Sequence, residues 1–168
     1  MTNSNSSNSP YILEMRNVSK TFPGVKALDQ INLRVKRGSV HALMGENGAG
    51  KSTLMKILYG IYIPDEGGEL ILDDKPFKPG RPIDAIRRGL TMVPQEISPA
   101  ANLTIADNFY LGREITKGKF FLNQKAMNEQ ASAILKELGV PMDVTEKMSD
   151  VSVAKAQLVA IATAVSND

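Results

Sequence analysis

The sequence predicts an α/β fold, with strands and helices mixed in the first half and helices dominating the second. Three observations lead to this prediction. A glycine-rich loop at residues 45–53 lies between a short apolar run and a helix-like segment. Two segments before the loop alternate apolar and polar residues over most of their length, as half-buried strands do. From about residue 97 onward, apolar residues recur at helical spacing.

The glycine-rich loop is the most specific feature of the chain. It matches the phosphate-binding pattern G-x-x-x-x-G-K-[ST] through Gly45, Glu46, Asn47, Gly48, Ala49, Gly50, Lys51 and Ser52, with Thr53 following. The three glycines allow a tight turn and a close approach of the backbone to a phosphate. Successive backbone N–H groups then point into one anion-binding hollow, where a helix starting near Gly50 adds the positive end of its dipole.

Three side chains of the loop have distinct predicted roles. Lys51 supplies a mobile positive charge for the β- and γ-phosphates of a nucleotide. The Ser52 hydroxyl is placed to hold Mg²⁺, and Thr53 can contact the α-phosphate. The alternative, a glycine-rich turn without a ligand, is disfavoured because the loop has a strand–loop–helix context. Val40–Met44 is predicted to be a buried strand, and Leu54–Gly60 a helix closed by glycine.

The segments before the loop predict a pair of strands. Tyr11–Val18 and Ile31–Val35 both alternate apolar and polar residues, and Pro23-Gly24 lies in their connection. Lys36–Gly38 then turns the chain toward the apolar run before the loop. This arrangement predicts strands that precede the phosphate-binding loop.

The segments after the loop predict a strand, a short helix and another strand. Glu69–Leu72 is a strand that follows two glycines and ends in a turn at Asp73–Lys75. Pro82–Arg88 is a helix with proline in its first turn and glycine at its end. Leu90–Pro94 returns as a strand.

The second half of the chain predicts two longer helices. Asn123 caps a helix that runs to Leu138, with Gly139 as its stop. Lys155–Val165 is a second, mostly apolar helix. Five apolar residues share one face of the first of these helices and are predicted to belong to the core: Met127, Ala131, Ile134, Leu135 and Leu138.

Composition and charge restrict the class of protein. The 168 residues carry a formal net charge of +2, from 20 basic and 18 acidic side chains, which gives no argument for nucleic-acid binding. The absence of cysteine excludes a disulfide framework and fits a cytoplasmic protein. Residues 1–10 are predicted to be a disordered tail. The apolar run Ala156–Val165 is about half the length that crosses a bilayer.

Several motifs in order resemble those of an ABC transporter nucleotide-binding domain. More narrowly, the chain resembles the first half of the tandem ATPase subunits of bacterial monosaccharide importers of the ribose, galactose and xylose type. Three phrases carry the resemblance: Phe22–Leu28, Met44–Thr53 and Val93–Glu96. It implies a P-loop NTPase fold of ABC type, with a partial nucleotide-binding core at 11–96 that includes an N-terminal antiparallel β subdomain. An α-helical subdomain at 97–168 would follow.

The resemblance also implies roles for residues outside the loop. Phe22 matches the aromatic position that stacks on adenine, although an aromatic that anchors the loop or core is the alternative. Gln95 matches the glutamine that reaches Mg²⁺ and the attacking water, so Lys51 and Gln95 are the candidate catalytic residues, and Ser52 and Gln95 the candidate metal ligands. Leu103–Asn108 lies near the surface that receives the permease.

Val151–Lys155 aligns with the family's signature motif, usually L-S-G-G-Q, with Lys155 as the less expected departure. Through Ser152, Val153 and Ala154 this segment would contact a nucleotide bound by an opposing domain. A plain serine cap on the last helix is the alternative.

The implied function is ATP binding and hydrolysis, with Mg²⁺, coupled to sugar uptake. The implied partners are transmembrane permease subunits, a second ABC half or ATPase subunit and, indirectly, an extracellular sugar-binding protein. The implied place is the cytoplasmic face of the cell membrane. Two alternatives remain: a non-catalytic nucleotide-binding or permease-docking fragment, and an ABC-type ATPase that does not serve transport.

The chain ends before the family's Walker B strand, so it resembles a truncated domain. No residue matches the Walker B aspartate, the catalytic glutamate or the switch histidine, because His41, the single histidine, precedes the loop. Hydrolysis needs a polarised water, and Mg²⁺ held from two sides. We therefore expect that this chain does not turn over ATP alone.

Overall fold

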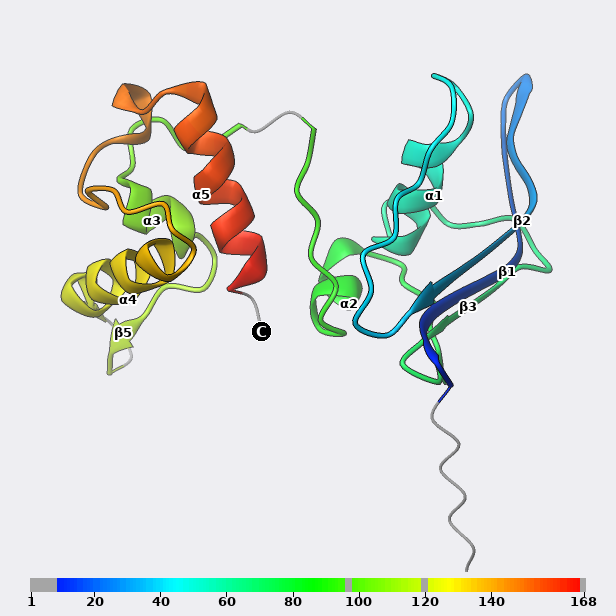
Figure 1. Ribbon diagram of the computed structural model, residues 1–168, viewed down its shortest axis with the longest axis horizontal. Coiled ribbons are helices and arrows are strands. Elements are labelled where there is room, and N and C mark those ends of the chain that lie inside the picture. The colour runs from blue at the N-terminus through cyan, green and yellow to red at the C-terminus, as the bar shows by residue number, and fades with distance from the viewer. Residues whose placement is uncertain (1–8, 96–97, 119–120, 167–168) are drawn as a thin grey trace, which may run out of the picture. The chain divides into compact units, whose positions relative to one another are not determined.

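The computed structural model describes residues 9–95, 98–118 and 121–166 (Figure 1). The chain divides into two compact units, Met1–Leu90 and Thr91–Asp168. The tail predicted at 1–10 lies outside the described residues, except for its last two positions. The domain boundary predicted between residues 96 and 97 also falls on undescribed residues and stays a prediction.

The first unit is built on a four-stranded antiparallel sheet with the strand order β2-β1-β3-β4. Its elements are β1 (Tyr11–Phe22), β2 (Val25–Lys36), α1 (Lys51–Leu58), β3 (Glu69–Leu72), β4 (Lys75–Pro76) and α2 (Pro82–Ile86). The two strands predicted before the loop are confirmed and are longer than their alternating patterns. They form a hairpin in which Phe22 pairs with Val25, and Gly24 turns the chain at φ 82°.

The predicted strand at Glu69–Leu72 is confirmed as β3. It pairs with β1 and, through a turn at Asp73 and Asp74, with β4. Both turn residues have positive φ, 50° and 60°, which aspartate tolerates better than most residues. The predicted helix at Pro82–Arg88 is confirmed as α2, although it ends at Ile86, with a turn over the next residues.

The core of the first unit lies between the sheet and α1. Leu54 and Ile57, from one face of α1, are buried together with side chains of the three longest strands. Full burial of such a side chain stabilises the fold by about 1.5–3 kcal/mol. The buried cluster consists of Leu13, Met15, Val18, Leu28, Leu54, Ile57, Leu70, Leu72, Phe77 and Ala85.

Two predicted strands are wrong. Val40–Met44 has no regular structure and is exposed, with exposed fractions of 101% for Val40 and 88% for Met44. Leu90–Pro94 also lacks strand structure. Among the described residues, no strand pairs with either segment. A buried strand must pair its N–H and C=O groups with neighbouring strands, so an apolar sequence without such a neighbour forms no strand.

The second unit is a helical cluster. Its elements are α3 (Ile105–Phe109), β5 (Thr116–Lys117), β6 (Phe121–Leu122), α4 (Gln124–Glu137), the 3₁₀ helix η1 (Met148–Asp150) and α5 (Val153–Val165). The short β5 and β6 pair with each other. The core consists of Ile105, Ala106, Phe109, Tyr110, Met127, Ala131, Leu135, Val144, Met148, Val159 and Ala162.

Both helices predicted in this half are confirmed. The side chain of Asn123 caps α4 by accepting a hydrogen bond from the Ala126 N–H at 3.3 Å, and Gly139 follows the helix at φ 75°. Met127, Ala131 and Leu135 are buried as predicted, and Ile134 packs against them. The prediction that Leu138 belongs to the core is wrong, since its side chain is 42% exposed. Leu138 stands at the end of the helix, beyond the packed turns.

No helix in the described ranges is both long enough and apolar enough to span a bilayer. The longest described helix, α4, has 14 residues. A membrane-spanning helix needs about 20 predominantly apolar residues.

We expect the exposed run Val40–Met44 to contribute little to the stability of the isolated chain. Val40→Ser and Met44→Ser should change the free energy of unfolding by less than about 0.5 kcal/mol, because neither side chain is buried, and should lower the binding of a dye that reports exposed apolar surface. Urea unfolding followed by circular dichroism checks the first expectation, and dye fluorescence the second.

The matched control is Ile57→Ala, since Ile57 is fully buried. This change should lower the free energy of unfolding by about 2–5 kcal/mol. A loss of more than about 1 kcal/mol in Val40→Ser would mean that the run is packed in solution.

Candidate nucleotide-binding site

The glycine-rich loop leads directly into α1, as predicted. The helix begins at Lys51, and Gly50 is its N-cap residue, with φ 83°. Gly48 has a similar φ of 87°. Both values lie in the left-handed region, which residues with a Cβ enter at a cost of about 1–2 kcal/mol. The loop therefore needs glycine at these two positions for conformational reasons alone.

The amino-terminal end of α1 has no capping side chain. Gly50 offers none, and no other described side chain accepts a hydrogen bond there, whereas Thr104, Asn123 and Ser152 cap α3, α4 and α5. The first N–H groups of a helix have no partner within the helix. At α1 these donors have no side-chain cap and lie at the positive end of the helix dipole, a position that favours an anion.

The Lys51 side chain folds back over the loop. Its ammonium Nζ donates hydrogen bonds to the carbonyl oxygens of Gly45 at 2.5 Å and Glu46 at 2.6 Å. Within the loop, the N–H of Ala49 donates to the same Glu46 oxygen at 3.2 Å. Two of the three donor protons of the ammonium are thus engaged by loop carbonyl oxygens in this structure. The charge of Lys51 therefore lies beside the uncapped helix end.

A contact between Gly50 and β2 brings the loop to the β1–β2 hairpin. In Figure 1, α1 lies beside the strands of this sheet. A Cβ placed on Gly50 would lie 2.6 Å from the carbonyl oxygen of Ala27 and 2.6 Å from Leu28 Cδ2. Ala27 is two residues from Val25, which pairs with Phe22. The loop and the predicted adenine-stacking residue are thus held to the same end of the hairpin.

Phe22 is half-buried and has two neighbours that the sequence did not indicate. Tyr62 packs against it in a T-shaped arrangement, with ring centroids 5.2 Å apart and planes at 74°. The Lys20 Nζ lies 5.4 Å from the ring centroid. These contacts fix the ring without burying it. The stacking role and the anchoring role therefore both fit this position, and the stacking role stays a prediction.

Asp65 holds the segment after α1 to the same hairpin. Its Oδ2 accepts a hydrogen bond from the Thr21 hydroxyl at 2.8 Å, and its N–H donates to the Ser19 carbonyl at 2.9 Å. The hydrogen bond from Thr21 holds the pKa of the Asp65 carboxyl below its ordinary value, with Lys20 contributing. Asp65 therefore stays ionised at neutral pH while it holds the segment after α1 to the strand that carries Phe22.

The candidate metal ligands lie in different units. Ser52, at the second position of α1, is exposed, and its hydroxyl makes no hydrogen bond within the described part of the chain. Gln95 is exposed in the second unit. No group of three or more His, Asp or Glu side chains that would hold a metal exists among the described residues. A free hydroxyl beside a phosphate site fits Mg²⁺, which takes few protein ligands and binds phosphate oxygens. The joint role of Ser52 and Gln95 stays a prediction.

Residues 28–168 match the protein family described as ABC transporter. The chain belongs to the ABC transporter family. A putative ribose/galactose/methyl galactoside import ATP-binding protein of Geobacillus kaustophilus is 49% identical over 157 residues, which are 93% of this chain and 31% of that protein. The chain thus spans about a third of the length of this relative.

Two solved structures support the ABC cassette fold. An ATP-binding cassette of an ABC transporter in its ADP conformation is similar with a TM-score of 0.79 and 27% identity, covering 95% of this chain and 66% of that one. A dimeric cassette in a post-hydrolysis state, bound to ADP and Pi, has a TM-score of 0.72 and 25% identity, covering 92% and 69%. The predicted α/β fold of ABC type is confirmed.

The signature-like segment of this ABC family member begins its last helix. Ser152 is the N-cap of α5, and its Oγ accepts a hydrogen bond from the Lys155 N–H at 3.4 Å. Val153 is 77% exposed, and Ala154 is exposed too. Because capping uses only the hydroxyl oxygen, the hydroxyl proton remains available to a phosphate. The cap is observed, and contact with an opposing nucleotide stays a prediction.

We expect Gly50→Ala to destabilise the first unit more than Gly48→Ala. Both residues have left-handed φ, but a Cβ on Gly48 meets nothing within 4 Å, while one on Gly50 would overlap Ala27 and Leu28. Gly48→Ala should therefore cost only the conformational strain, about 1–2 kcal/mol. Gly50→Ala should lower the free energy of unfolding clearly more than Gly48→Ala does, as measured by urea unfolding. Equal losses in the two variants would contradict the close contact with β2.

Proposed function

We propose that this chain binds ATP and is the nucleotide-binding part of an ATPase subunit that drives sugar import. The observation that carries the proposal is the uncapped start of α1 with the Lys51 ammonium beside it, in a chain of the ABC transporter family. The relative from Geobacillus kaustophilus, named as a sugar import ATP-binding protein, supports the sugar class.

In the proposed binding mode, the triphosphate occupies the hollow before α1. The free N–H groups at the start of the helix donate to phosphate oxygens, and Lys51 exchanges its bonds to the carbonyl oxygens of Gly45 and Glu46 for bonds to the β- and γ-phosphates. Phe22 stacks on the adenine from the hairpin. Bound Mg²⁺, held through the Ser52 hydroxyl and Gln95, would neutralise phosphate charge.

In the proposed assembly, two cassettes enclose two ATP molecules. Ser152 of one cassette donates its hydroxyl proton to the γ-phosphate held by the other. The similar cassette that is dimeric with ADP and Pi supports this arrangement. The other partners would be a transmembrane permease, which follows the opening and closing of the cassettes, and indirectly an extracellular sugar-binding protein. The chain would then work at the cytoplasmic face of the membrane.

We propose that this chain binds ATP without turning it over alone. Lys51 and Gln95 would orient and stabilise the phosphates, but none of the residues matches the carboxylate that polarises water in the family. Binding without hydrolysis would also fit a non-catalytic module.

Copurification with a permease, and not with ribosomes, would separate a transport role from an ABC-type role away from membranes.

Replacement of Lys51 tests the phosphate site. The unaltered chain should bind MgATP, and Lys51→Ala should weaken binding by roughly 10- to 100-fold, because it removes charge-assisted hydrogen bonds. Isothermal titration calorimetry on the full 168-residue chain measures both. The matched control is Lys36→Ala, since Lys36 is exposed at the end of β2. Equal binding by the Lys51 and Lys36 variants, or no binding by the unaltered chain, would contradict the proposal.

Replacement of Phe22 separates adenine binding from phosphate binding. Phe22→Ala should weaken ATP binding roughly fivefold or more, since stacking of a base on an aromatic ring contributes about 1–3 kcal/mol. Binding of inorganic tripolyphosphate, which has no base, should not change. Parallel titrations of both ligands check this expectation. A similar loss for both ligands would show that Phe22 only anchors the hairpin.

A further inference from the structure

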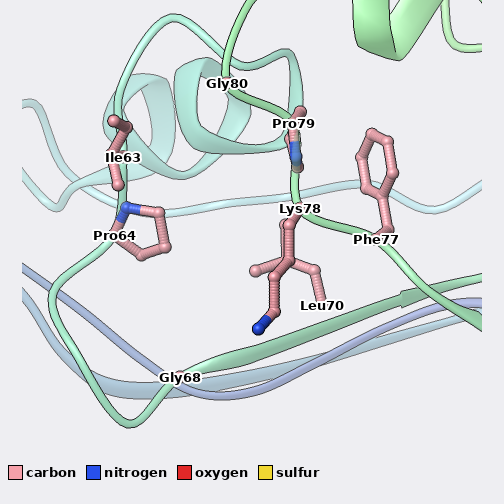
Figure 2. Close-up of a pocket in the computed structure, with 8 residues that line it drawn as sticks. All are labelled: Ile63, Pro64, Gly68, Leu70, Phe77, Lys78, Pro79 and Gly80. Atoms are coloured by element: carbon pink, nitrogen blue, oxygen red, sulfur yellow. The ribbon is translucent and has the colours of Figure 1, made fainter.

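A pocket in the first unit is lined by residues that the proposed nucleotide site does not use. Its volume is about 290 Å³, and Figure 2 shows the side chains around it. One wall comes from the segment after α1, one from the segment after β4, and the floor from the start of β3. The lining consists of Ile63, Pro64, Gly68, Leu70, Phe77, Lys78, Pro79 and Gly80.

The walls of this pocket are fixed without a ligand. Gly60 packs against the second wall so closely that a Cβ on it would lie 2.7 Å from the Arg81 carbonyl oxygen. A Cβ on Gly68 would lie 3.1 Å from Val18 Cα in β1. The Phe77 N–H donates to the Leu70 carbonyl at 2.8 Å. A pocket that is already formed costs a ligand little conformational entropy on binding.

The pocket is apolar with one cationic group. Ile63, Pro64, Leu70, Phe77 and Pro79 form its apolar surface, and Lys78 is the single charged residue of the lining. Figure 2 shows the Lys78 side chain overlapping that of Leu70 in this view, with its nitrogen directed toward the strands at the floor of the pocket.

Two polar groups in or next to the lining are already engaged. Within the described residues, Lys78 has no hydrogen bond or ion pair, whereas the N–H of Gly80 donates to Asp84 Oδ2 at 3.2 Å. The nearby Asp65 carboxylate is bonded to Thr21 at 2.8 Å. The Lys78 ammonium is therefore the charged side-chain group that this lining offers to a ligand.

We propose that this pocket binds a small monocarboxylate with an apolar body, such as an aryl carboxylic acid. The apolar body would lie among Pro64, Leu70 and Phe77, and the carboxylate would pair with the Lys78 ammonium. A charged hydrogen bond beside an apolar wall recognises such a molecule at both of its ends. A nucleotide fits poorly, because one ammonium does not balance several phosphate charges. This site is separate from the nucleotide site, and the inference does not depend on ATP binding.

Titration with 2-naphthoate tests the proposal on the ¹⁵N-labelled full chain. We expect saturable chemical-shift changes in NMR spectra at the backbone amides of Gly68, Leu70, Phe77, Lys78 and Gly80. Lys78→Met should weaken binding roughly fivefold, and Lys78→Arg should largely restore it, because the arginine keeps the charge. Lys75→Met should leave binding unchanged, since Lys75 lies on β4 outside the lining. The neutral amide, 2-naphthamide, should bind the unaltered chain as weakly as 2-naphthoate binds Lys78→Met.

Four outcomes would overturn the proposal. The first is the absence of saturable shifts at these amides up to millimolar ligand. The second is equal affinity for 2-naphthoate and 2-naphthamide, which would make the pocket a nonselective apolar surface. The third is an equal loss of affinity for 2-naphthoate in the Lys75→Met and Lys78→Met variants. The fourth is displacement of 2-naphthoate by excess tripolyphosphate, which would place the ligand at the phosphate-binding loop.

Discussion

The close contact between Gly50 and β2 is the constraint on which the candidate site depends. Because Gly50 has no side chain, the loop backbone reaches the Ala27 carbonyl and Leu28, and the start of α1 is fixed against the hairpin that carries Phe22. The same glycine leaves the helix end without a capping group. One residue therefore both positions the helix and keeps its N–H groups free, and a Cβ at that position would remove the contact that holds the two parts together.

The short helix α1 links this constraint to the rest of the first unit. Leu54 and Ile57 bury its inner face against the sheet, so the core holds the helix axis in place. Its far end leads to Gly60, which packs on the segment that forms one wall of the pocket beside Lys78. The two candidate binding sites are therefore joined through one rigid element, although their chemistry differs: one presents N–H groups to several charges, and the other a single ammonium beside apolar side chains.

The sequence predicted the elements whose stability depends on local signals. The loop, the Asn123 cap and the glycine after α4 are specified by a few neighbouring residues, and the structure has them where the patterns indicate. Val40–Met44 and Leu90–Pro94 were mispredicted because an apolar run indicates only a tendency toward burial, and a strand also requires partners far away in the chain. The contact of Gly50 with Ala27, and the pocket at Lys78, arise from packing between distant segments. No periodicity or motif encodes them.

The exposed run Val40–Met44 has a consequence for handling the protein in solution. An exposed apolar segment that pairs with no strand among the described residues is a template on which a second molecule can add a strand. This segment ends immediately before Gly45, the first residue of the loop. Aggregation that begins there would engage the backbone beside the phosphate site, so the fraction of molecules able to bind a ligand should fall as protein concentration rises. Dilution would then preserve the ligand-binding fraction better than cooling, because the hydrophobic effect weakens only gradually on cooling.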